Sequence, residues 1–443
     1  MFFEIYSHGK LIKRGTQILN ELSWENELMY TPDMDLVLPI EYLEFLSGRE
    51  EVKVFISDKC FWGIVVDLEA DKDNETLTVK LEHVIHEWEY RQISVNNAIK
   101  EKTVNVVFKE ATEEDPYAGD PSVQDQLDDI YADTNFAYPG WELDYSHKAE
   151  NTSIDYVYSR QNKLEALTKT MELTPDLFWR VNFQDKKRIE ISEFGDKKPY
   201  SFSKKPTGHS NIRIISDPVI DFDFKNVINV ASVYSEKSDT GMSSMTLREV
   251  YDDPSLQIQG FPVVILRKNV NNERDYTKYI YQYPMLAPNN ELEYAVLDEK
   301  SIALEGGAVI EGTFAFNDLS PFTPDKNADG KTQEITDADR IAAAKVAYHA
   351  AIRKLINARR SYKIIFSTEE FPTDLNVGDM VRFIYDNSIF VLESCSNYMK
   401  KVLTVSDWFY LTRVEYDYGK DESGIFTVTL EKELRIDRDT DNE

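Results

Sequence analysis

Cysteine is scarce in this chain, and its scarcity excludes several kinds of site. Cys60 and Cys395 are the only two cysteines among 443 residues. Two cysteines separated by most of the chain form neither a disulfide framework nor a zinc-ligand pattern. Buried free thiols, in a protein that folds in a reducing cytosol, are the simplest interpretation.

Long apolar runs are also missing. No stretch approaches the roughly 18 apolar residues of a membrane-spanning helix. Residues 1–15 do not combine a charged segment with an apolar core, so we predict no signal peptide. We therefore expect no membrane span. If the protein leaves the cell, we expect it to leave inside an assembled particle.

Positive charge is too sparse to bind nucleic acid. The chain has 79 acidic and 50 basic residues and a net charge of −29. Such a chain repels phosphate unless it carries a basic stripe, and the sequence shows none. The densest basic clusters, 186–188 and 359–360, adjoin strand-like runs, and we interpret them as solvated edges.

The sequence also lacks the short motifs of common enzymes. It has no G-x-S-x-G element, no P-loop and no G-x-G-x-x-G pattern, and neither cysteine lies in a nucleophile-like context. These gaps favour a non-enzymatic protein without a nucleotide cofactor.

Strand signals dominate what is present. Aromatic residues make up 12% of the chain, which suits pleated surfaces. Apolar and polar residues alternate over 51–57, and similar runs at 61–70 and 76–85 flank an acidic turn. Several hairpins at this spacing predict a small barrel or a strongly bent sheet over residues 1–100.

Helical signals are fewer but clear. Ser122 can cap a short helix at 122–133, and Leu164, Leu167 and Met171 share one face of a second helix. Two strands at 177–183 and 188–194 should follow it. Residues 219–235 resemble paired strands.

An Ala-rich helix is predicted at 337–361, with Thr336 or Asp337 as its N-cap. Its apolar face should contain Ile341, Tyr348, Ile352 and Ile356, interrupted by Lys345. Five further strand signals follow this helix, with a Gly turn at 372–379.

We therefore predict an α+β, mainly β chain with two small β-barrel-like domains and mixed α/β domains. The expected domains are a first β-barrel at 1–105, a mixed α+β domain at 106–210, a second β-barrel at 211–245 and 362–440, and an inserted α+β domain at 246–361 that contains the helix at 337–361.

One segment resembles a calcium loop. Asp325, Asn327 and Asp329 alternate ahead of Gly330, and the carbonyl of Lys331 would be the next ligand. The loop departs from the pattern at its twelfth position, where Thr336 replaces a bidentate carboxylate. The alternatives are a Ca²⁺ site and a solvated loop that leads into a helix.

Two other segments have a functional and a structural interpretation. His83 and His86 would share a helix face as metal ligands, but the strand pattern puts them on opposite faces and favours structural histidines. The aromatic strand 408–418 could stack on carbohydrate, although its alternation favours core packing.

The order of the segments resembles the tail-hub family of bacterial viruses. That family includes baseplate hubs and the N-terminal region of tail-associated lysins. The resemblance covers most of residues 1–435 and depends on five segments in the same order: 133–145, 162–191, 227–235, 297–307, and the long helix with 371–386.

This resemblance implies a homotrimeric ring at the virion tail tip, with two similar barrels per subunit in six quasi-equivalent positions. DNA would pass through the ring without specific binding. The implied neighbours are a distal tail protein ring, a tape-measure protein and a tail fibre or receptor-binding protein. The alternatives are a cell-wall-degrading lysin whose catalytic domain is missing from this chain, and a carbohydrate-binding tail module.

Overall fold

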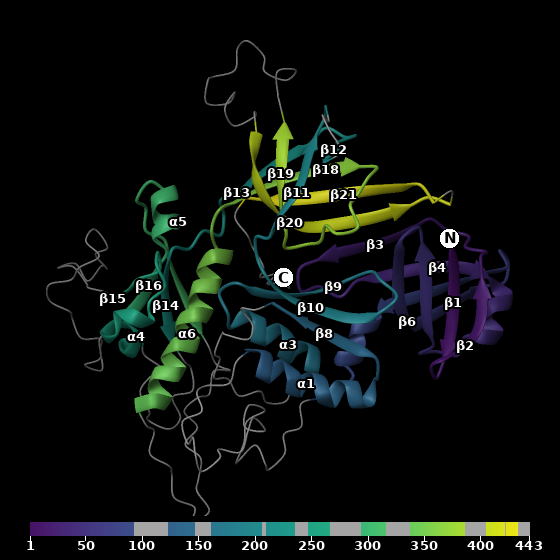
Figure 1. Cartoon of the computed structure of the whole chain (residues 1–443), viewed down its shortest axis with the longest axis horizontal. Helices are drawn as coiled ribbons and strands as arrows, with labels where there is room; N and C mark the ends of the chain where they lie inside the picture. Colours follow the sequence, from purple (N-terminus) through teal and green to yellow (C-terminus); the bar gives the residue numbers. More distant parts are fainter. Residues whose placement is uncertain are drawn as a thin grey trace, which may run out of the picture.

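The computed structural model describes residues 1–92, 123–146, 161–205, 210–234, 247–265, 294–315, 337–385, 405–420 and 422–432. In these ranges the chain is mainly β, with its strands gathered into four sheets and helices beside them (Figure 1). The predicted α+β, mainly β class is confirmed. No helix in this part of the chain combines the length and apolar composition that a bilayer crossing requires.

The N-terminal sheet has six strands in the order β2-β1-β5-β6-β7-β4. These strands are β1 (Phe2–Ser7), β2 (Lys10–Gly15), β4 (Asp33–Pro39), β5 (Glu51–Ile56), β6 (Lys59–Asp71) and β7 (Thr76–His83). The predicted alternation is present in β5, where Val52, Val54 and Ile56 are buried and the residues between them are partly exposed. Two short 3-10 helices, η1 (Ile40–Phe45) and η2 (Val84–Trp88), follow β4 and β7.

The middle unit packs two helices on the three-stranded sheet β8-β10-β9. Its elements are α1 (Val123–Ala137), β8 (Trp141–Tyr145), α3 (Lys163–Glu172), β9 (Leu177–Val181) and β10 (Lys187–Glu193). Asn162 and Glu165 form a capping box at the start of α3. The predicted face of α3, Leu164, Leu167 and Met171, is buried, and β9 and β10 pair antiparallel as expected.

The C-terminal sheet has the strand order β12-β11-β19-β20-β21-β18-β13. Its strands are β11 (Lys197–Ser203), β12 (Asn211–Arg213), β13 (Val219–Asp223), β18 (Ser361–Thr368), β19 (Met380–Tyr385), β20 (Val405–Tyr418) and β21 (Gly424–Glu431). An eighth strand, β3 (Leu22–Glu27), joins the sheet from the N-terminal part of the chain by pairing with β20. Alternate residues of β20, including Phe409, Leu411 and Tyr416, are buried, in agreement with core packing.

The remaining sheet has four strands in the order β15-β16-β14-β17. Its strands are β14 (Val230–Tyr234), β15 (Val263–Ile265), β16 (Tyr294–Leu297) and β17 (Glu311–Ala315). The helices beside it are α4 (Arg248–Asp252), η5 (Pro254–Leu256), α5 (Glu299–Leu304) and α6 (Asp337–Asn357). Helix α6 contacts both β14 and β16, and in Figure 1 it stands between this sheet and the middle unit.

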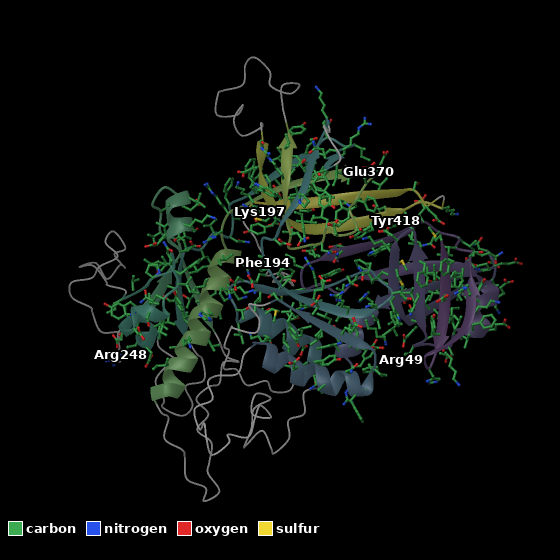
Figure 2. All side chains as sticks on the ribbon, in the orientation of Figure 1. Arg49, Phe194, Lys197, Arg248, Glu370 and Tyr418 are labelled. Atoms are coloured by element: carbon green, nitrogen blue, oxygen red, sulfur yellow. The ribbon has the colours of Figure 1, made fainter. Side chains whose placement is uncertain are left out.

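The core is continuous where the two large sheets meet the middle unit. Trp24 of β3 stacks on Tyr416 and Tyr418 of β20, with ring centroids 5.1 and 5.3 Å apart. The same indole lies 5.8 Å from Phe61 of β6 and 5.5 Å from Phe183, which follows β9. Side chains fill this region in Figure 2, where Tyr418 lies between the two large sheets. The aromatic cluster joins segments that are far apart in the sequence.

The prediction of closed barrels is wrong for the described residues, because both large sheets follow an open strand order. The ends of each sheet nevertheless approach each other. After β2, the Leu19 N–H donates to the Val37 carbonyl of β4 at 2.8 Å. After β12, an isolated bridge joins Ile214 to Thr368 of β18. Each sheet is therefore strongly bent, which is the other alternative for residues 1–100.

Two further expectations are corrected. Residues 219–235 do not pair with one another, because β13 joins β18 while β14 joins β16 and β17. In α6, Tyr348 and Ile352 are buried as predicted, but Ile341 is 39% exposed. The buried face of α6 mixes four alanines with larger residues such as Val346 and Leu355.

Candidate functional site

Four strands of the N-terminal sheet are repeated in the C-terminal sheet. In chain order β4, β5, β6 and β7 correspond to β18, β19, β20 and β21. Both sets have the same spatial order, β5-β6-β7-β4 and β19-β20-β21-β18, and every pair within them is antiparallel. The flanking strands differ, since β1 pairs antiparallel with β5 whereas β11 pairs parallel with β19.

The turn before β5 is the first detailed match. Arg49, at φ +67°, donates its N–H to the Val65 carbonyl at 3.0 Å, and the Val65 N–H donates to the Glu50 carbonyl at 2.9 Å. The Glu50 carboxylate accepts the backbone N–H groups of Ser47 and Gly48 at 3.0 and 2.7 Å. Burial would raise the pKa of Glu50, but hydrogen bonds from Ser47 and Gly48 lower it overall.

The turn before β19 repeats this geometry. Gly378, at φ +92°, donates its N–H to the Leu411 carbonyl at 2.7 Å, and the Leu411 N–H donates to the Asp379 carbonyl at 2.8 Å. The Asp379 carboxylate accepts the Asn376 N–H at 3.0 Å. Glycine is required at 378, because a Cβ there would overlap the ring of Phe178.

The bulges and the bent ends of the sheets match as well. Val66 is skipped in the pairing of β6 with β7, and Thr412 is skipped at the corresponding place between β20 and β21. The Val37 N–H donates to the Asn20 side chain at 2.9 Å, as the Ser367 N–H does to Ser216 at 2.8 Å. These correspondences identify an internal structural duplication.

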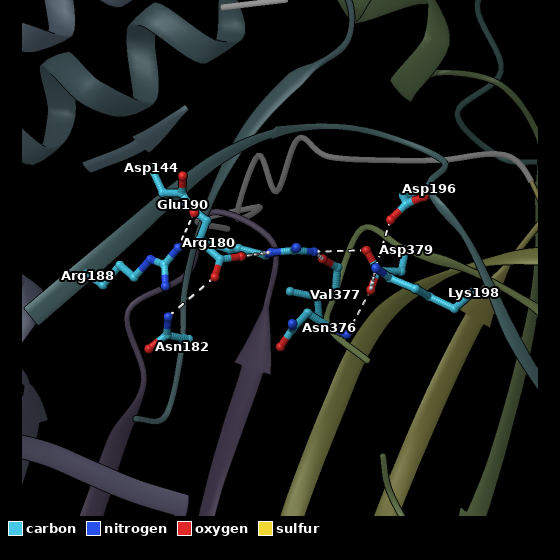
Figure 3. A network of polar contacts seen from close by, with 10 residues as sticks. All are labelled: Asp144, Arg180, Asn182, Arg188, Glu190, Asp196, Lys198, Asn376, Val377 and Asp379. Carbon is cyan, nitrogen blue, oxygen red and sulfur yellow. Dashed lines mark hydrogen bonds and ion pairs between the residues drawn. The ribbon is translucent and has the colours of Figure 1, made fainter. Parts of the chain in front are cut away.

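Asp379 also belongs to a buried ion network that joins the middle unit to the C-terminal sheet (Figure 3). Arg180 of β9 donates to the Val377 carbonyl at 2.7 Å, to Asp379 at 3.1 Å and to Glu190 at 2.8 Å. Lys198 approaches Asp379 to 4.0 Å. Burial raises the pKa of Asp379, and the cations Arg180 and Lys198 offset this only in part.

A second buried cation joins the middle unit to the N-terminal sheet. Lys187 of β10 lies 2.7 Å from the carboxylate of Glu87 and 3.4 Å from that of Glu51. The indole N–H of Trp141 donates to Glu87 at 2.8 Å. Burial raises the pKa of Glu87, while Lys187 opposes that shift. The interpretation of Lys187 as a solvated edge residue is therefore wrong.

Two more buried arginines, one in α6 and one just after it, bind acceptors from distant parts of the chain. Arg353 is 1% exposed and donates to the carbonyls of Met171, Thr174 and Leu177 at 2.6, 3.0 and 2.7 Å. Arg359 pairs with the fully buried Asp298, with hydrogen bonds of 2.6 and 3.0 Å. The interpretation of Arg359 as a solvated edge residue is therefore also wrong.

The predicted calcium residues Asp325, Asn327, Asp329 and Lys331 lie outside the described residues, so the Ca²⁺ site stays a prediction. Among the described residues no group of three or more His, Cys, Asp or Glu side chains is placed to hold a metal ion.

His83 and His86 have structural roles, although His86 lies in the 3-10 helix η2 and not in the strand that the sequence pattern predicts. His83 is buried among aromatic rings, 5.8 Å from Phe61 and 6.0 Å from Phe183, and its Nδ1 accepts the Ile85 N–H at 3.2 Å. Burial, and then the nearby His86, lower the pKa of His83 to about 3. His86 pairs with Glu89 at 2.6 Å.

Sequence reasoning missed Arg180, Lys187 and Arg353 as structural cations. A charged residue beside a strand looks solvated until its distant partner is known. These three residues could have been noticed because each is charged at a position where the strand or helix pattern predicts a buried apolar residue.

Comparisons with known proteins give likenesses of structure and none of sequence. No protein-family model matches the chain, and no curated protein matches it. A tail protein from Neisseria meningitidis MC58 has a TM-score of 0.52 at 10% identity, covering 97% of this chain and 96% of that one. The prophage tail protein gp18 from Listeria monocytogenes EGD-e has a TM-score of 0.52 at 9% identity, covering 97% and 94%. The chain shares the fold of these two proteins.

Proposed function

We propose that this chain is a structural hub of the tail tip of a bacterial virus or phage-like particle. Three copies would form a ring around the DNA exit channel. The observation that carries the proposal is the duplicated set of four strands, with matching turns, bulges and hydrogen bonds. The shared fold with two phage tail proteins supports it.

The duplication suits a position where symmetries change. One chain presents two equivalent sheets, so three chains present six equivalent positions around a threefold axis. Such a ring can match a sixfold tube on one face and a threefold tip on the other, and its cyclic symmetry closes without free ends. The predicted domain boundaries belong to this proposal, with the two domains predicted as barrels as its repeated parts.

Acidic residues at equivalent positions support a lining that DNA can slide past. Glu69 and Asp71 of β6 correspond to Glu415 and Asp417 of β20, so the two repeats carry the same acids. All four alternate with the more apolar positions of their strands and are at least partly exposed. We propose that they face the bore, where carboxylates repel phosphate. A ring with a basic or apolar bore would contradict this assignment.

The partners follow from the same role. We propose a distal tail ring on the tube side, and a tape-measure protein and a fibre or receptor-binding protein as the other neighbours. The role is structural and requires no catalytic step.

The test is the mass of the purified full-length chain over a range of concentrations. A trimer has about 154 kDa, three times the 51.3 kDa of the chain. An assembly of three copies with a central opening in electron micrographs is the expected result. A chain that stays monomeric at every concentration, or that closes as a dimer, would contradict the proposal.

A further inference from the structure

The two copies of the repeat also differ in the occupancy of a strand edge. In β20, residues 413–418 pair with β21 on one side and with β3 on the other. In β6, the corresponding residues 67–71 pair with β7, and no described residue pairs with their other edge. The equivalent side chains differ accordingly, since Tyr416 is 1% exposed and Ala70 is exposed.

The strand that corresponds to β3 is β13. Leu19 and Asn20 precede β3, and Ile215 and Ser216 precede β13, and both pairs of residues make the same hydrogen bonds to the edge of their own sheet. Counting forward from these two matched pairs aligns β3 with β13, so that Trp24 corresponds to Ile220 and Glu25 to Asp221.

The side chains of the matched strands are buried in one copy and exposed in the other. On β3, Trp24, Asn26 and Leu28 lie on a buried face, with at most 7% exposure. Their counterparts are Ile220, Phe222 and Phe224, of which Phe222 is 42% and Phe224 is 56% exposed.

Strand β13 has an available edge, but it cannot reach β6 of the same chain. One edge pairs with β18, and β13 ends the strand order of the C-terminal sheet among the described residues. Figure 1 places β13 and β6 far apart, with the rest of the C-terminal sheet between them. If β13 fills the edge of β6 as β3 fills that of β20, it therefore comes from another molecule.

We propose that β13 of one copy pairs with residues 67–71 of β6 in the next copy. This inference rests on the proposed function and names the surfaces that close the ring. The register of β3 on β20 puts Glu415 opposite Glu25, so in the new pair Glu69 lies opposite Asp221. The same register brings Phe224 beside Val66, which is 44% exposed. Two exposed apolar residues are thereby covered, as Leu28 and Thr412 are in the occupied copy.

The pairing is head-to-tail, because each copy offers β13 and accepts with β6. Such contacts form a ring when the rotation closes. In the proposed trimer three β3–β20 junctions within chains alternate with three β13–β6 junctions between chains. Like charges face each other at Glu69 and Asp221, as they do at Glu415 and Glu25. Arg413 pairs with Glu25 at 2.6 Å, but its counterpart in β6 is Asp67, which the same register puts opposite Asp223.

The experiment is disulfide cross-linking of the full chain with a Glu69→Cys/Asp221→Cys double variant. Cys395→Ser removes one native thiol, and Cys60 can stay because burial raises the pKa of its thiol to about 12. Mild oxidation is expected to convert monomer to covalent trimer on a denaturing gel, with monomer returning on reduction.

Two control variants define the geometry. Glu25→Cys/Glu415→Cys tests the equivalent pair within one chain and should give a compact monomer. Glu44→Cys/Asp221→Cys keeps one partner and moves the other to an exposed site outside β6, and it should give no trimer.

Separately, Phe224→Ser should weaken trimer formation about tenfold while the melting temperature of the monomer is retained.

The outcomes separate this inference from the proposed function. One outcome is a native trimer that does not cross-link through residues 69 and 221, although the control within one chain does. That result refutes the β13–β6 pairing but is consistent with the proposed trimeric hub. A covalent dimer with both pairs joined supports the pairing and refutes the threefold ring. A monomer that never cross-links refutes both.

Discussion

Glu50 and Asp379 occupy the same place in the two repeats but have different neighbours. Both accept backbone N–H groups of the turn that precedes their strand. Only Asp379 faces a buried arginine, Arg180, which comes from the middle unit. The carboxylate thus stabilises only its own turn in the N-terminal sheet, whereas in the C-terminal sheet it also binds the middle unit.

We expect Asp379→Ala to destabilise the fold by about 3 kcal/mol, because it leaves Arg180 without one of its buried acceptors. The matched Glu50→Ala change removes only the turn contacts and should cost about 1 kcal/mol. Denaturant unfolding at neutral pH measures both. Equal losses would show that the ion pair adds nothing beyond the turn.

His83 makes stability depend on pH. Its pKa falls from the ordinary 6.5 to about 3 on folding, so the unfolded chain binds its proton at a higher pH than the folded chain. The contribution is therefore fully present above pH 6.5 and is lost as pH falls towards 3.

The prediction is that His83→Asn, which keeps a capping acceptor, flattens the loss of stability between pH 6.5 and about 4. Urea unfolding at several pH values measures it. His349, whose pKa burial lowers to about 4, keeps part of the slope. His8→Asn on the exposed surface is the matched control, and a similar flattening there would exclude His83 as the cause.

At the scale of elements, α6 is held by polar contacts as much as by its apolar face. Arg353 donates to three carbonyls, those of Met171 in the last turn of α3, of Thr174 just after it and of Leu177 at the start of β9. A guanidinium suits this place because its several N–H donors are fixed in one plane. The arginine therefore fastens two helices that lie far apart in the sequence.

Arg353→Met should destabilise the chain by about 3 kcal/mol, since buried carbonyls lose their donors. Amide hydrogen exchange should rise at the end of α3 before it rises in the N-terminal sheet. Arg360→Met, at a half-exposed ion pair with Glu305, is the control and should cost less than about 1 kcal/mol. Unchanged exchange at α3 in the Arg353 variant would contradict this role.

At the scale of the whole molecule, the middle unit connects the other parts through buried cations. Arg180 joins it to the C-terminal sheet and Lys187 joins it to the N-terminal sheet. Removing one partner of such a pair is costly, so the relative placement of the parts is stabilised. A ring that passes load between a tube and a tip benefits from such fixed junctions.

Assembly should tighten as salt is raised, because Glu69 lies opposite Asp221 in the proposed contact and like charges facing across strands repel. Sedimentation at low and high salt measures the trimer fraction. Glu69→Gln/Asp221→Asn should lose part of the salt effect, since Asp67 still lies opposite Asp223, whereas Glu41→Gln/Glu44→Gln, matched in charge on η1, should keep it all. Weaker assembly at high salt in the native chain would argue against this contact.

The sequence by itself determined the elements whose signals are local. Alternation in β5 and β20, the apolar face of α3 and the Ala-rich run of α6 each depend on neighbouring residues, so they could be read directly. The turn at Gly378 and Asp379 was visible for the same reason.

Only the tertiary structure decided which of these elements meet. The pairing of β3 with β20 joins residues nearly 400 positions apart, such as Glu25 and Arg413, 388 apart. Lys187 and Arg359 look solvated in the sequence and become buried only when Glu87 and Asp298 reach them. The duplication is visible in the backbone hydrogen bonds, because these do not depend on side-chain identity and can persist where residue similarity has been lost.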